Sequence, residues 1–427
     1  MHNWAKDLFP FCRSITGSDV RKTLKYLQGI VPEIEIREVP SGTEAFDWRV
    51  PNEWSVRDAF ISDISGNKIV SFHENNLHLM GYSTPVDRVL TRSQLEDHLH
   101  SIPSQPDAIP YVTSYYKENW GFCLSENQRV LLGEGPFRVL IDSTLEPGTM
   151  TYGEAILPGE TQNEILLSTY ICHPSMANNE LSGPVVATAL LRWLKLQPHR
   201  RFTYRVIFIP ETIGSIYYLS RHLNELKTNV KAGWVLTCIG DERNYSYVPT
   251  RFGNTFTDRI SRKILEDRAF PYTLYSFLDR GSDERQFCFP GIDLPIGSLM
   301  RSKYQEFPEY HTSFDNLDFV TPLGLLGGFE MLRDAISIAE ANRFMKTTTL
   351  CEPQLSKRNL YPDTSFRNSS LGVKDQMNVL TYCDGDHDLL EIAKICDLKF
   401  QDVETIVSTL ENAGLVEEIL DRAASGI

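Results

Sequence analysis

Three residues that can bind a metal or move a proton follow apolar segments of this chain, and a fourth lies in a later loop. His173, Glu211 and Asp241 each come shortly after an apolar stretch, and His311 lies in a later loop. Imidazole and carboxylate groups together suit zinc, and a catalytic zinc site keeps one position open for water. A carboxylate that is not bound to the metal can take the proton from that water, and we assign this role to Glu211.

The elements that must position these groups alternate between strand and helix. Strands are expected at 165–171, 202–209 and 233–239, and helices at 183–196 and 216–226. Such alternation predicts parallel βαβ units and a mostly parallel sheet with helices on both faces. Functional groups in an open parallel sheet gather just past the carboxyl ends of the strands. We therefore expect the three strand-end residues at one edge of the sheet.

Each residue taken alone has a simpler explanation. Asn179 or Ser182 can cap the helix that follows, and Glu211 can be a carboxylate that faces the N-terminus of a helix. A single His or Asp at the end of a strand is more often a hydrogen-bonded loop residue. The joint pattern favours a site over coincidence.

The residue patterns change along the chain and predict three domains. Short β-like runs separated by Gly- and Pro-containing turns predict a mainly β domain at 47–158, inserted into an α/β domain formed by 1–46 and 159–350. Helical patterns followed by a short strand predict a winged-helix domain at 355–427.

Composition excludes some partners and compartments. The formal net charge of -14 argues against a general binder of nucleic acid, because phosphate binding depends on Lys and Arg. The eight cysteines form no CxxC pair, so reduced thiols are expected rather than disulfides. No apolar run is long enough to span a membrane, and the first residues lack the pattern of a signal peptide. We expect a cytoplasmic protein that does not bind membranes.

The C-terminal segment is acidic. From Lys374 onward it contains 12 acidic and 4 basic residues, and the second predicted helix carries Asp402 and Glu404. Phosphate would repel such a recognition helix, so a protein–protein role such as homo-oligomerisation is expected instead of nucleic-acid binding.

Several short motifs of the sequence resemble those of a known family. They are Cys12-Arg-Ser-Ile-Thr-Gly17, Phe46-Asp-Trp-Arg-Val-Pro51, Trp120-Gly-Phe-Cys123, Cys172-His-Pro-Ser175 and Tyr310-His-Thr-Ser313. The whole chain resembles bacterial aminopeptidase-like proteins associated with polysaccharide biosynthesis. The residues around the strand ends resemble the zinc-dependent aminopeptidases of the leucyl aminopeptidase type, which also include glutaminyl cyclases. The resemblance implies a zinc-exopeptidase-like α/β fold.

The resemblance also implies roles for individual residues. By position, His173 and Asp241 match the ligands of one metal, and His311 matches a ligand of a second metal. Glu211 matches the general base. Asn179 stands where the aminopeptidases have a carboxylate that bridges two zinc ions, and Glu180 follows it.

Two departures from the family pattern change the expected metal content. The amide of Asn179 is neutral, and Thr212 stands where the aminopeptidases have a second Glu ligand. Two divalent cations held close together need carboxylates to offset their repulsion. One zinc ion is therefore expected, with Glu180 or Glu211 available to join the ligands. A metal-free descendant ranks second and a two-zinc site third.

The surroundings of the site suggest a substrate pocket. Asp283, Glu284 and Arg285 form a charged loop that is either a pocket wall or a solvated turn, and Tyr310 precedes His311. The leading hypothesis is a zinc-dependent hydrolase of amide bonds, with a small peptide or an acylated amino-sugar as substrate. The alternative is a non-catalytic binding or scaffold protein built on a decayed peptidase fold.

Overall fold

The computed structural model describes residues 1–268, 270–360 and 371–419. These residues form two compact units. The first comprises Met1–Arg251 with Tyr272–Glu330, and the second comprises Phe252–Pro271 with Met331–Ile427. All the candidate site residues belong to the first unit. Among the described residues, none of the helices combines the length and the apolar character that crossing a bilayer requires.

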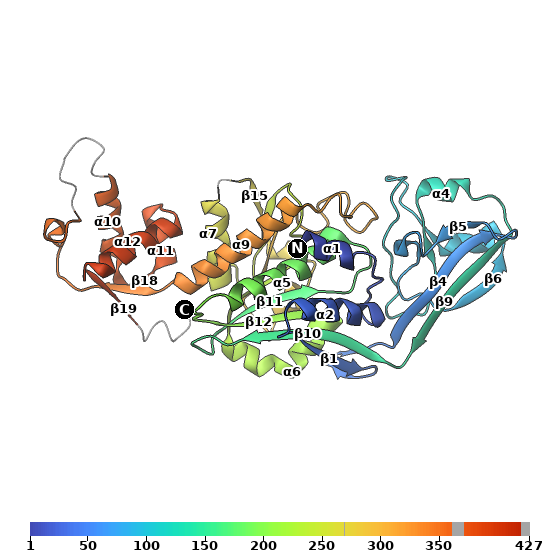
Figure 1. Ribbon diagram of the computed structural model, residues 1–427, viewed down its shortest axis with the longest axis horizontal. Coiled ribbons are helices and arrows are strands. Elements are labelled where there is room, and N and C mark those ends of the chain that lie inside the picture. Colours follow the sequence, from blue (N-terminus) through green and yellow to red (C-terminus); the bar gives the residue numbers. More distant parts are fainter. Residues whose placement is uncertain (269, 361–370, 420–427) are drawn as a thin grey trace. The chain divides into compact units, whose positions relative to one another are not determined.

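A mixed sheet of eight strands forms the centre of the first unit (Figure 1). In sheet order its strands are β1 (Glu35–Pro40), β10 (Thr149–Leu157), β12 (Thr203–Ile209), β11 (Glu164–Tyr170), β13 (Val230–Val235), β16 (Ile296–Met300), β14 (Tyr245–Val248) and β15 (Tyr272–Leu274). The four strands β12, β11, β13 and β16 are mutually parallel, as the alternating pattern predicted. Antiparallel pairs add β10 and β1 at one side and β14 at the other, so the sheet is mixed.

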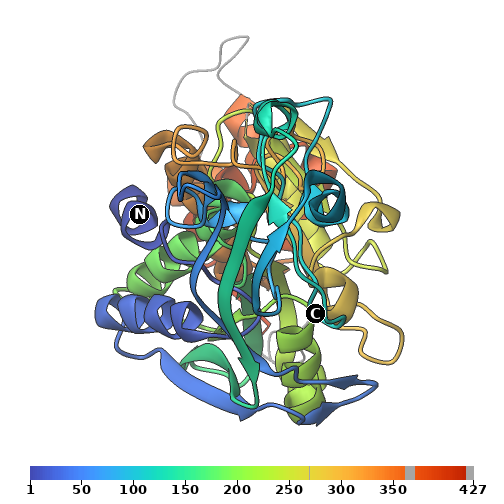
Figure 2. The same cartoon turned by 90° about the vertical axis from the view of Figure 1, so that its right-hand side faces the viewer.

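Helices cover both faces of this sheet, as expected (Figures 1 and 2). Helix α5 (Ser182–Lys195) connects β11 to β12, and helix α6 (Ile213–Asn229) connects β12 to β13 on the other side of β11. The two crossovers run in opposite directions across the sheet. Because such crossovers are right-handed, α5 and α6 must lie on opposite faces. Helices α1 (His2–Leu8) and α2 (Ser18–Ile30) contact α5 and β10 respectively.

The turn between β11 and α5 approaches the sheet closely. A π-helical turn, Ala177–Leu181, leads directly into α5, and all five of its residues are buried. At Gly183 an added Cβ would lie 2.2 Å from the Leu236 carbonyl oxygen and 2.3 Å from Thr169 Oγ1. Only glycine therefore allows the start of α5 to pack against the ends of the central strands.

A second sheet, of four antiparallel strands, is built from the segment expected to be inserted. Its order is β5 (Lys68–Ser71), β4 (Glu53–Asp63), β9 (Phe137–Glu146) and β6 (Val86–Leu90). The expected range 47–158 also contains β10, but β10 pairs with β1 and β12 in the central sheet. The expected domain boundaries remain a prediction; the strand pairing places the change of sheet between β9 and β10.

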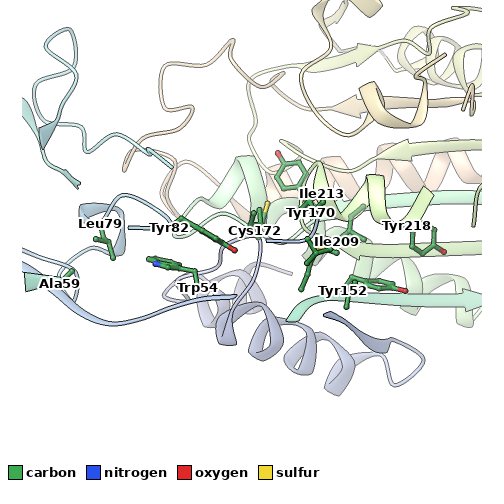
Figure 3. Packing of buried hydrophobic residues seen from close by; sticks show 14 of the residues in the cluster. Trp54, Ala59, Leu79, Tyr82, Tyr152, Tyr170, Cys172, Ile209, Ile213 and Tyr218 are labelled. Carbon is green, nitrogen blue, oxygen red and sulfur yellow. The ribbon is translucent and has the colours of Figure 1, made fainter. Parts of the chain in front are cut away.

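One hydrophobic cluster extends from the smaller sheet into the central one (Figure 3). Trp54 and Tyr82 belong to the smaller sheet and its loops, whereas Cys172 and Ile209 lie at the ends of central strands, and all four are buried. Trp54 and Tyr82 stack with their ring centroids 5.7 Å apart. The inserted segment is therefore held against the edge of the sheet where the candidate site lies.

The second unit contains a three-stranded sheet and several helices. Its elements are α7 (Phe256–Asp267), the part of α9 (Pro322–Ala341) from Met331, β17 (Phe344–Thr347), α10 (Leu371–Tyr382), β18 (Asp384–Asp388), α11 (Leu389–Cys396), α12 (Phe400–Asn412) and β19 (Val416–Glu418). Strand β17, which precedes the expected start at 355, pairs with both β18 and β19. Parts of the predicted domain, 361–370 and 420–427, lie outside the described residues.

Candidate active site

His173 lies in the loop that follows β11. Its backbone N–H donates a hydrogen bond to the Glu180 carboxylate, which fixes the loop at the end of the strand. The side chain is only 5% exposed. Burial, assisted by the Arg13 guanidinium, lowers the pKa of the imidazole to about 3. His173 is therefore neutral at physiological pH, which is the form that binds metals.

Glu211 faces His173 from the loop after β12. Its Oε2 lies 3.8 Å from His173 Nε2, too far for a hydrogen bond, and 22% of the side chain is exposed. Burial, together with the nearby Asp283 carboxylate, raises the pKa of Glu211 to about 8, although Arg285 opposes the shift. In the absence of a cation this carboxyl group can hold a proton at neutral pH.

Cys172 is a third potential ligand that sequence reasoning did not select. Its Sγ lies 3.4 Å from His173 Nδ1 and accepts a hydrogen bond from the Glu211 backbone N–H at 3.3 Å. Donor atoms of Cys172, His173 and Glu211 all lie within 4.8 Å of one another. The available signal was the position of this thiol directly before a predicted metal ligand.

His311 lies beside His173, with the two ring centroids 5.4 Å apart. Its Nε2 lies 3.1 Å from Asn179 Oδ1, so a protonated Nε2 donates to this amide oxygen. The amide nitrogen of Asn179 donates to the Tyr170 hydroxyl at 2.7 Å. The structure thus brings both histidines and Asn179 to one place, and hydrogen bonds engage both ends of the Asn179 amide.

Glu180 lies close to His173, with its Oε2 3.4 Å from His173 Nδ1, but it is engaged by another partner. Its carboxylate forms a salt bridge with the Arg13 guanidinium, and both side chains are fully buried. Arg13 also donates to the Leu8 carbonyl oxygen at 2.7 Å. The pair ties the N-terminal segment to the turn that carries His173, so Glu180 is committed to a structural interaction.

Asp241 lies in a separate hydrogen-bonded setting. Its two oxygens accept bonds from the Ser302 N–H at 2.9 Å, the Ser302 hydroxyl at 2.7 Å and the Arg243 N–H at 2.9 Å. The Asn178 amide donates a further bond at 3.1 Å. The carboxylate is fully buried and already satisfied. The group of donor atoms around His173 does not include it.

Asp283 and the short helix α8 (Glu284–Phe287) that follows it pack against the Glu211 turn. Asp283 Oδ1 accepts bonds from the Thr212 N–H and from the Ser215 hydroxyl, both at 2.8 Å, and Arg285 Nη2 donates to Thr212 Oγ1 at 2.7 Å. Asp283 and Glu284 are fully buried, which excludes a solvated turn.

Glu284 itself has an internal role. Its carboxylate accepts bonds from the Gly281 N–H at 2.8 Å, the Ser282 N–H at 3.0 Å, the Tyr304 hydroxyl at 2.6 Å and the Ser298 hydroxyl at 3.0 Å. These bonds shape the loop that places Asp283 and Arg285 beside the Glu211 turn.

Aromatic rings cover the two histidines. Tyr310 stacks on His311 with centroids 3.9 Å apart. Tyr111, from the inserted segment, lies 5.1 Å from both the His173 and the His311 rings, and its backbone N–H donates to the His311 carbonyl oxygen at 2.9 Å. Sequence reasoning missed Tyr111, because a single loop tyrosine 62 residues from His173 carries no pattern. Its neighbour Tyr115 shares a hydroxyl–hydroxyl bond of 2.6 Å with it.

Asp315 organises the turn that carries Asn179. It accepts the backbone N–H groups of Asn178 at 2.6 Å and Asn179 at 2.8 Å, and it is fully buried. Burial raises its pKa to about 7, although these backbone bonds oppose the shift. Sequence reasoning assigned no role to this residue.

Several residues at the site have strained backbone conformations. Thr212 has φ +65°, which is a rare conformation for a β-branched residue, and His311 has φ +56°. Ser175 and Cys238, in the loops after β11 and β13, also have positive φ. Such strained residues persist where the surrounding contacts over-determine them, and they cluster at active sites.

Comparison with known proteins places this geometry in a family. Residues 2–342 match the family model described as Domain of unknown function (DUF4910), and residues 343–418 match a winged helix-turn-helix model. The chain belongs to the DUF4910 family. A Clostridium acetobutylicum relative, provisionally named a polysaccharide biosynthesis protein with aminopeptidase-like domain, is 44% identical over 98% of this chain and 96% of its own.

Solved structures agree with the family assignment. A crystal structure of a provisionally named peptidase from Clostridium acetobutylicum superimposes with a TM-score of 0.92 at 43% identity, covering 98% of this chain and 96% of that one. A zinc aminopeptidase from Bacillus subtilis superimposes with a TM-score of 0.57 at 13% identity, covering 79% and 94%. The expected aminopeptidase-like α/β fold and C-terminal winged helix are confirmed.

Proposed function

We propose that this chain is a zinc-dependent hydrolase of amide bonds that acts in the manner of an aminopeptidase. The observation that carries the proposal is the opposition of His173 Nε2 and Glu211 Oε2 across 3.8 Å, at the carboxyl edge of the parallel strands. A neutral imidazole and a half-buried carboxyl group, arranged around a space too wide for a direct hydrogen bond, are the components of such a site.

The donor chemistry of this site fits one zinc ion. His173 offers a neutral imidazole nitrogen, Cys172 a sulfur and Glu211 a carboxylate oxygen within 4.8 Å of one another. Zinc accepts imidazole nitrogen and sulfur as ligands, which leaves the Glu211 carboxylate beside the ion to act as the base. When bound, the ion would act as a Lewis acid that polarises the amide carbonyl. We propose His173 and Cys172 as its principal protein ligands, with His311 and Asn179 beside them.

A second ion fits poorly. The amide of Asn179 is engaged by His311 and Tyr170, the Glu180 carboxylate is paired with Arg13, and Thr212 replaces a carboxylate. Few anionic groups then remain to offset the repulsion between two divalent cations.

Residues of the chain supply proton transfer, substrate binding and the positioning of Glu211. Glu211 takes the proton of the attacking water and returns it to the leaving amine. Tyr111 and Tyr310 limit the access of water and hold the substrate over His173 and His311. Arg285 fixes Thr212 and thereby the direction in which Glu211 points, so Asp283, Glu284 and Arg285 act as positioning residues.

Purified protein tests the proposal by metal analysis and by turnover. Elemental analysis is expected to give about one zinc per chain, because the described residues offer a single group of donor atoms. Aminoacyl-anilides and acylated amino-sugars, each assayed with and without a chelator, supply the activity panel. Glu211→Gln should keep the metal and lose at least about 100-fold in turnover, whereas the exposed Glu146→Gln should change neither. Unchanged turnover in Glu211→Gln would contradict the role proposed for this residue.

Partners and location are proposed from the charge of the chain. Asp402 on α12 is exposed and Glu404 is half-buried. The acidic winged helix is therefore proposed to bind protein, including a second copy of the chain, rather than nucleic acid. The cytoplasm is proposed as the location, since the eight cysteines are free thiols. If purified protein contains no zinc and hydrolyses none of the substrates tested, the non-catalytic binding or scaffold role is favoured over the hydrolase.

A further inference from the structure

A chain of hydrogen bonds begins at Thr237, in the loop after β13. Its hydroxyl lies 2.7 Å from the Asn179 backbone carbonyl oxygen and 2.6 Å from the Tyr170 hydroxyl. A carbonyl oxygen can only accept, so the single hydroxyl proton of Thr237 is donated to it. The Cys238 sulfur, 3.4 Å from the same hydroxyl, is a weaker acceptor. The contact with Tyr170 then requires that Tyr170 donates its own proton to Thr237 Oγ1.

The donation by Tyr170 fixes the orientation of the Asn179 side chain. The Tyr170 oxygen has given up its only proton, so it can only accept a further bond. The nitrogen of the Asn179 side-chain amide lies 2.7 Å away and donates to it. The amide oxygen is thereby turned toward His311 Nε2, at 3.1 Å. Thr237, Tyr170 and Asn179 are all buried, so bulk water does not replace these partners.

This arrangement selects one tautomer of the His311 imidazole. At pH 8, above the ordinary imidazole pKa of about 6.5, the ring is neutral and carries one proton. The Asn179 amide oxygen can only accept, so the proton lies on Nε2 and the free lone pair lies on Nδ1. If the proton were on Nδ1, two lone pairs would face each other across 3.1 Å.

The Nδ1 atom of His311 is an acceptor that a ligand can reach. No residue that the structure describes forms a hydrogen bond with it. It is not one of the unpaired atoms that burial hides from water, and His311 is half-buried. The His173 ring lies 5.4 Å from the His311 ring, so a ligand that binds there lies beside the candidate active site.

We infer that His311 binds the amino group of the substrate through Nδ1 and is not a ligand of a second metal ion. A protonated Nε2 has no lone pair for a metal. An aminopeptidase-like substrate carries a free amino group, which is a donor that the Nδ1 lone pair can accept. The identity of this donor rests on the proposed function, whereas the tautomer rests only on the hydrogen bonds of the chain itself.

The tautomer can be measured by ¹⁵N NMR at pH 8 on the full chain labelled in its histidines. Comparison with His311→Gln identifies the His311 signals. The Nε2–H tautomer is expected in at least about tenfold excess, the ratio that one hydrogen bond supplies.

Thr237→Val should reverse this tautomer from a distance. Without the Thr237 hydroxyl, the Tyr170 proton is free to bond the Asn179 amide oxygen, which turns the amide nitrogen toward His311 Nε2. The Nδ1–H tautomer should then become the major form. Thr188→Val removes a buried hydroxyl outside this chain of bonds and should leave the tautomer unchanged.

A second variant covers the case in which Thr237→Val does not fold. Tyr170→Phe removes the acceptor that orients the Asn179 amide, so both tautomers of His311 should be present. A single Nε2–H tautomer in folded Tyr170→Phe and Thr237→Val would refute the orienting role of this chain of bonds.

Two further measurements separate the binding of an amine from the binding of a metal. L-Leucine or L-alanine should shift the Nδ1 signal of His311, whereas 4-methylpentanoate and propanoate, which lack only the amino group, should not. In protein loaded with ¹¹³Cd²⁺, the metal should couple to a nitrogen of His173 and to neither nitrogen of His311.

A major Nδ1–H tautomer in the parent protein, coupling of cadmium to His311, or an Nδ1 signal that neither amino acid shifts would overturn the inference. A shift that depends on the amino group, without hydrolysis of any aminoacyl-anilide, would support the role of His311 and count against the proposed function. Hydrolysis of aminoacyl-anilides by a protein in which cadmium couples to His311 would support the proposed function and refute the inference.

Discussion

At the scale of single residues, the site depends on which donors are free and which are already engaged. His173 and Glu211 face each other without a direct hydrogen bond, whereas Glu180 and Asp241 are satisfied by buried partners. Residue type alone does not separate these cases, since all four are potential zinc ligands. What distinguishes them is the set of hydrogen bonds that each carboxylate has already made.

Cys172 gives a test that does not depend on activity. Protein loaded with Co²⁺ should show a near-ultraviolet band from sulfur-to-cobalt charge transfer, because a coordinating thiol loses its proton to the metal. Cys172→Ser should lose this band, and Cys123→Ser, buried outside the site, should keep it. Absence of the band in the parent protein would mean that Cys172 only fills space.

The Arg13–Glu180 pair gives a second residue-scale prediction. Arg13→Met leaves a buried carboxylate without its counter-charge and should lower the free energy of unfolding by about 3–5 kcal/mol. Arg13→Met combined with Glu180→Gln should recover most of this loss. Denaturant titration of the two single variants and the double variant measures the coupling. Additive losses would show that the two side chains do not depend on each other.

At the scale of elements, the junctions between strands and helices decide the geometry. The π-helical turn before α5 is held by Asp315, and the strained Thr212 begins the turn into α6. Two glycines on helices of the same unit test how closely these elements approach the sheet.

Gly183→Ala should destabilise the protein by about 2–3 kcal/mol, because the new Cβ would lie 2.2 Å from the Leu236 carbonyl oxygen. Gly29→Ala in α2 is the matched control. No atom lies within 4 Å of a Cβ there, and the higher helix propensity of alanine should add about 0.5–1 kcal/mol. Thermal unfolding should show a loss of stability for Gly183→Ala and a gain for Gly29→Ala. Equal changes in the two variants would contradict the close approach of α5 to the sheet.

At the scale of the whole molecule, the distribution of charge decides which partners are available. The net charge is -14, and the winged-helix segment is itself acidic. A winged helix that binds DNA needs cations that displace the counter-ions of the phosphates. The winged-helix segment therefore has the fold of a DNA-binding module but lacks the positive charge that binding to phosphates requires.

The full chain should not retain duplex DNA at micromolar protein and physiological salt. Replacing Asp402 and Glu404 with lysine should produce weak, salt-dependent binding, because the local repulsion is removed. A mobility-shift assay at two salt concentrations measures DNA binding by the unmodified chain and by the double lysine variant. Salt-sensitive binding by the unmodified chain would contradict the prediction and assign the segment to nucleic acid.

The sequence by itself predicted the α/β class, the parallel strands β11, β12 and β13, and the nearness of His173 to Glu211, but it also placed Asp241 with them, whereas the structure binds that carboxylate to Ser302. These follow from short-range patterns, because the alternation of strand and helix places successive strand ends at one edge of a sheet. The same patterns placed β10 with the inserted strands, since a strand's composition does not reveal which sheet it joins.

Only the tertiary structure decided which polar groups are free and which distant residues complete the site. Arg13 reaches Glu180 across 167 positions, and Tyr111 reaches the histidines from the inserted segment. Cys172 became a candidate ligand through its distance to Glu211. Such contacts leave no periodic signal in the sequence, because they depend on how whole elements pack and not on the spacing within one of them.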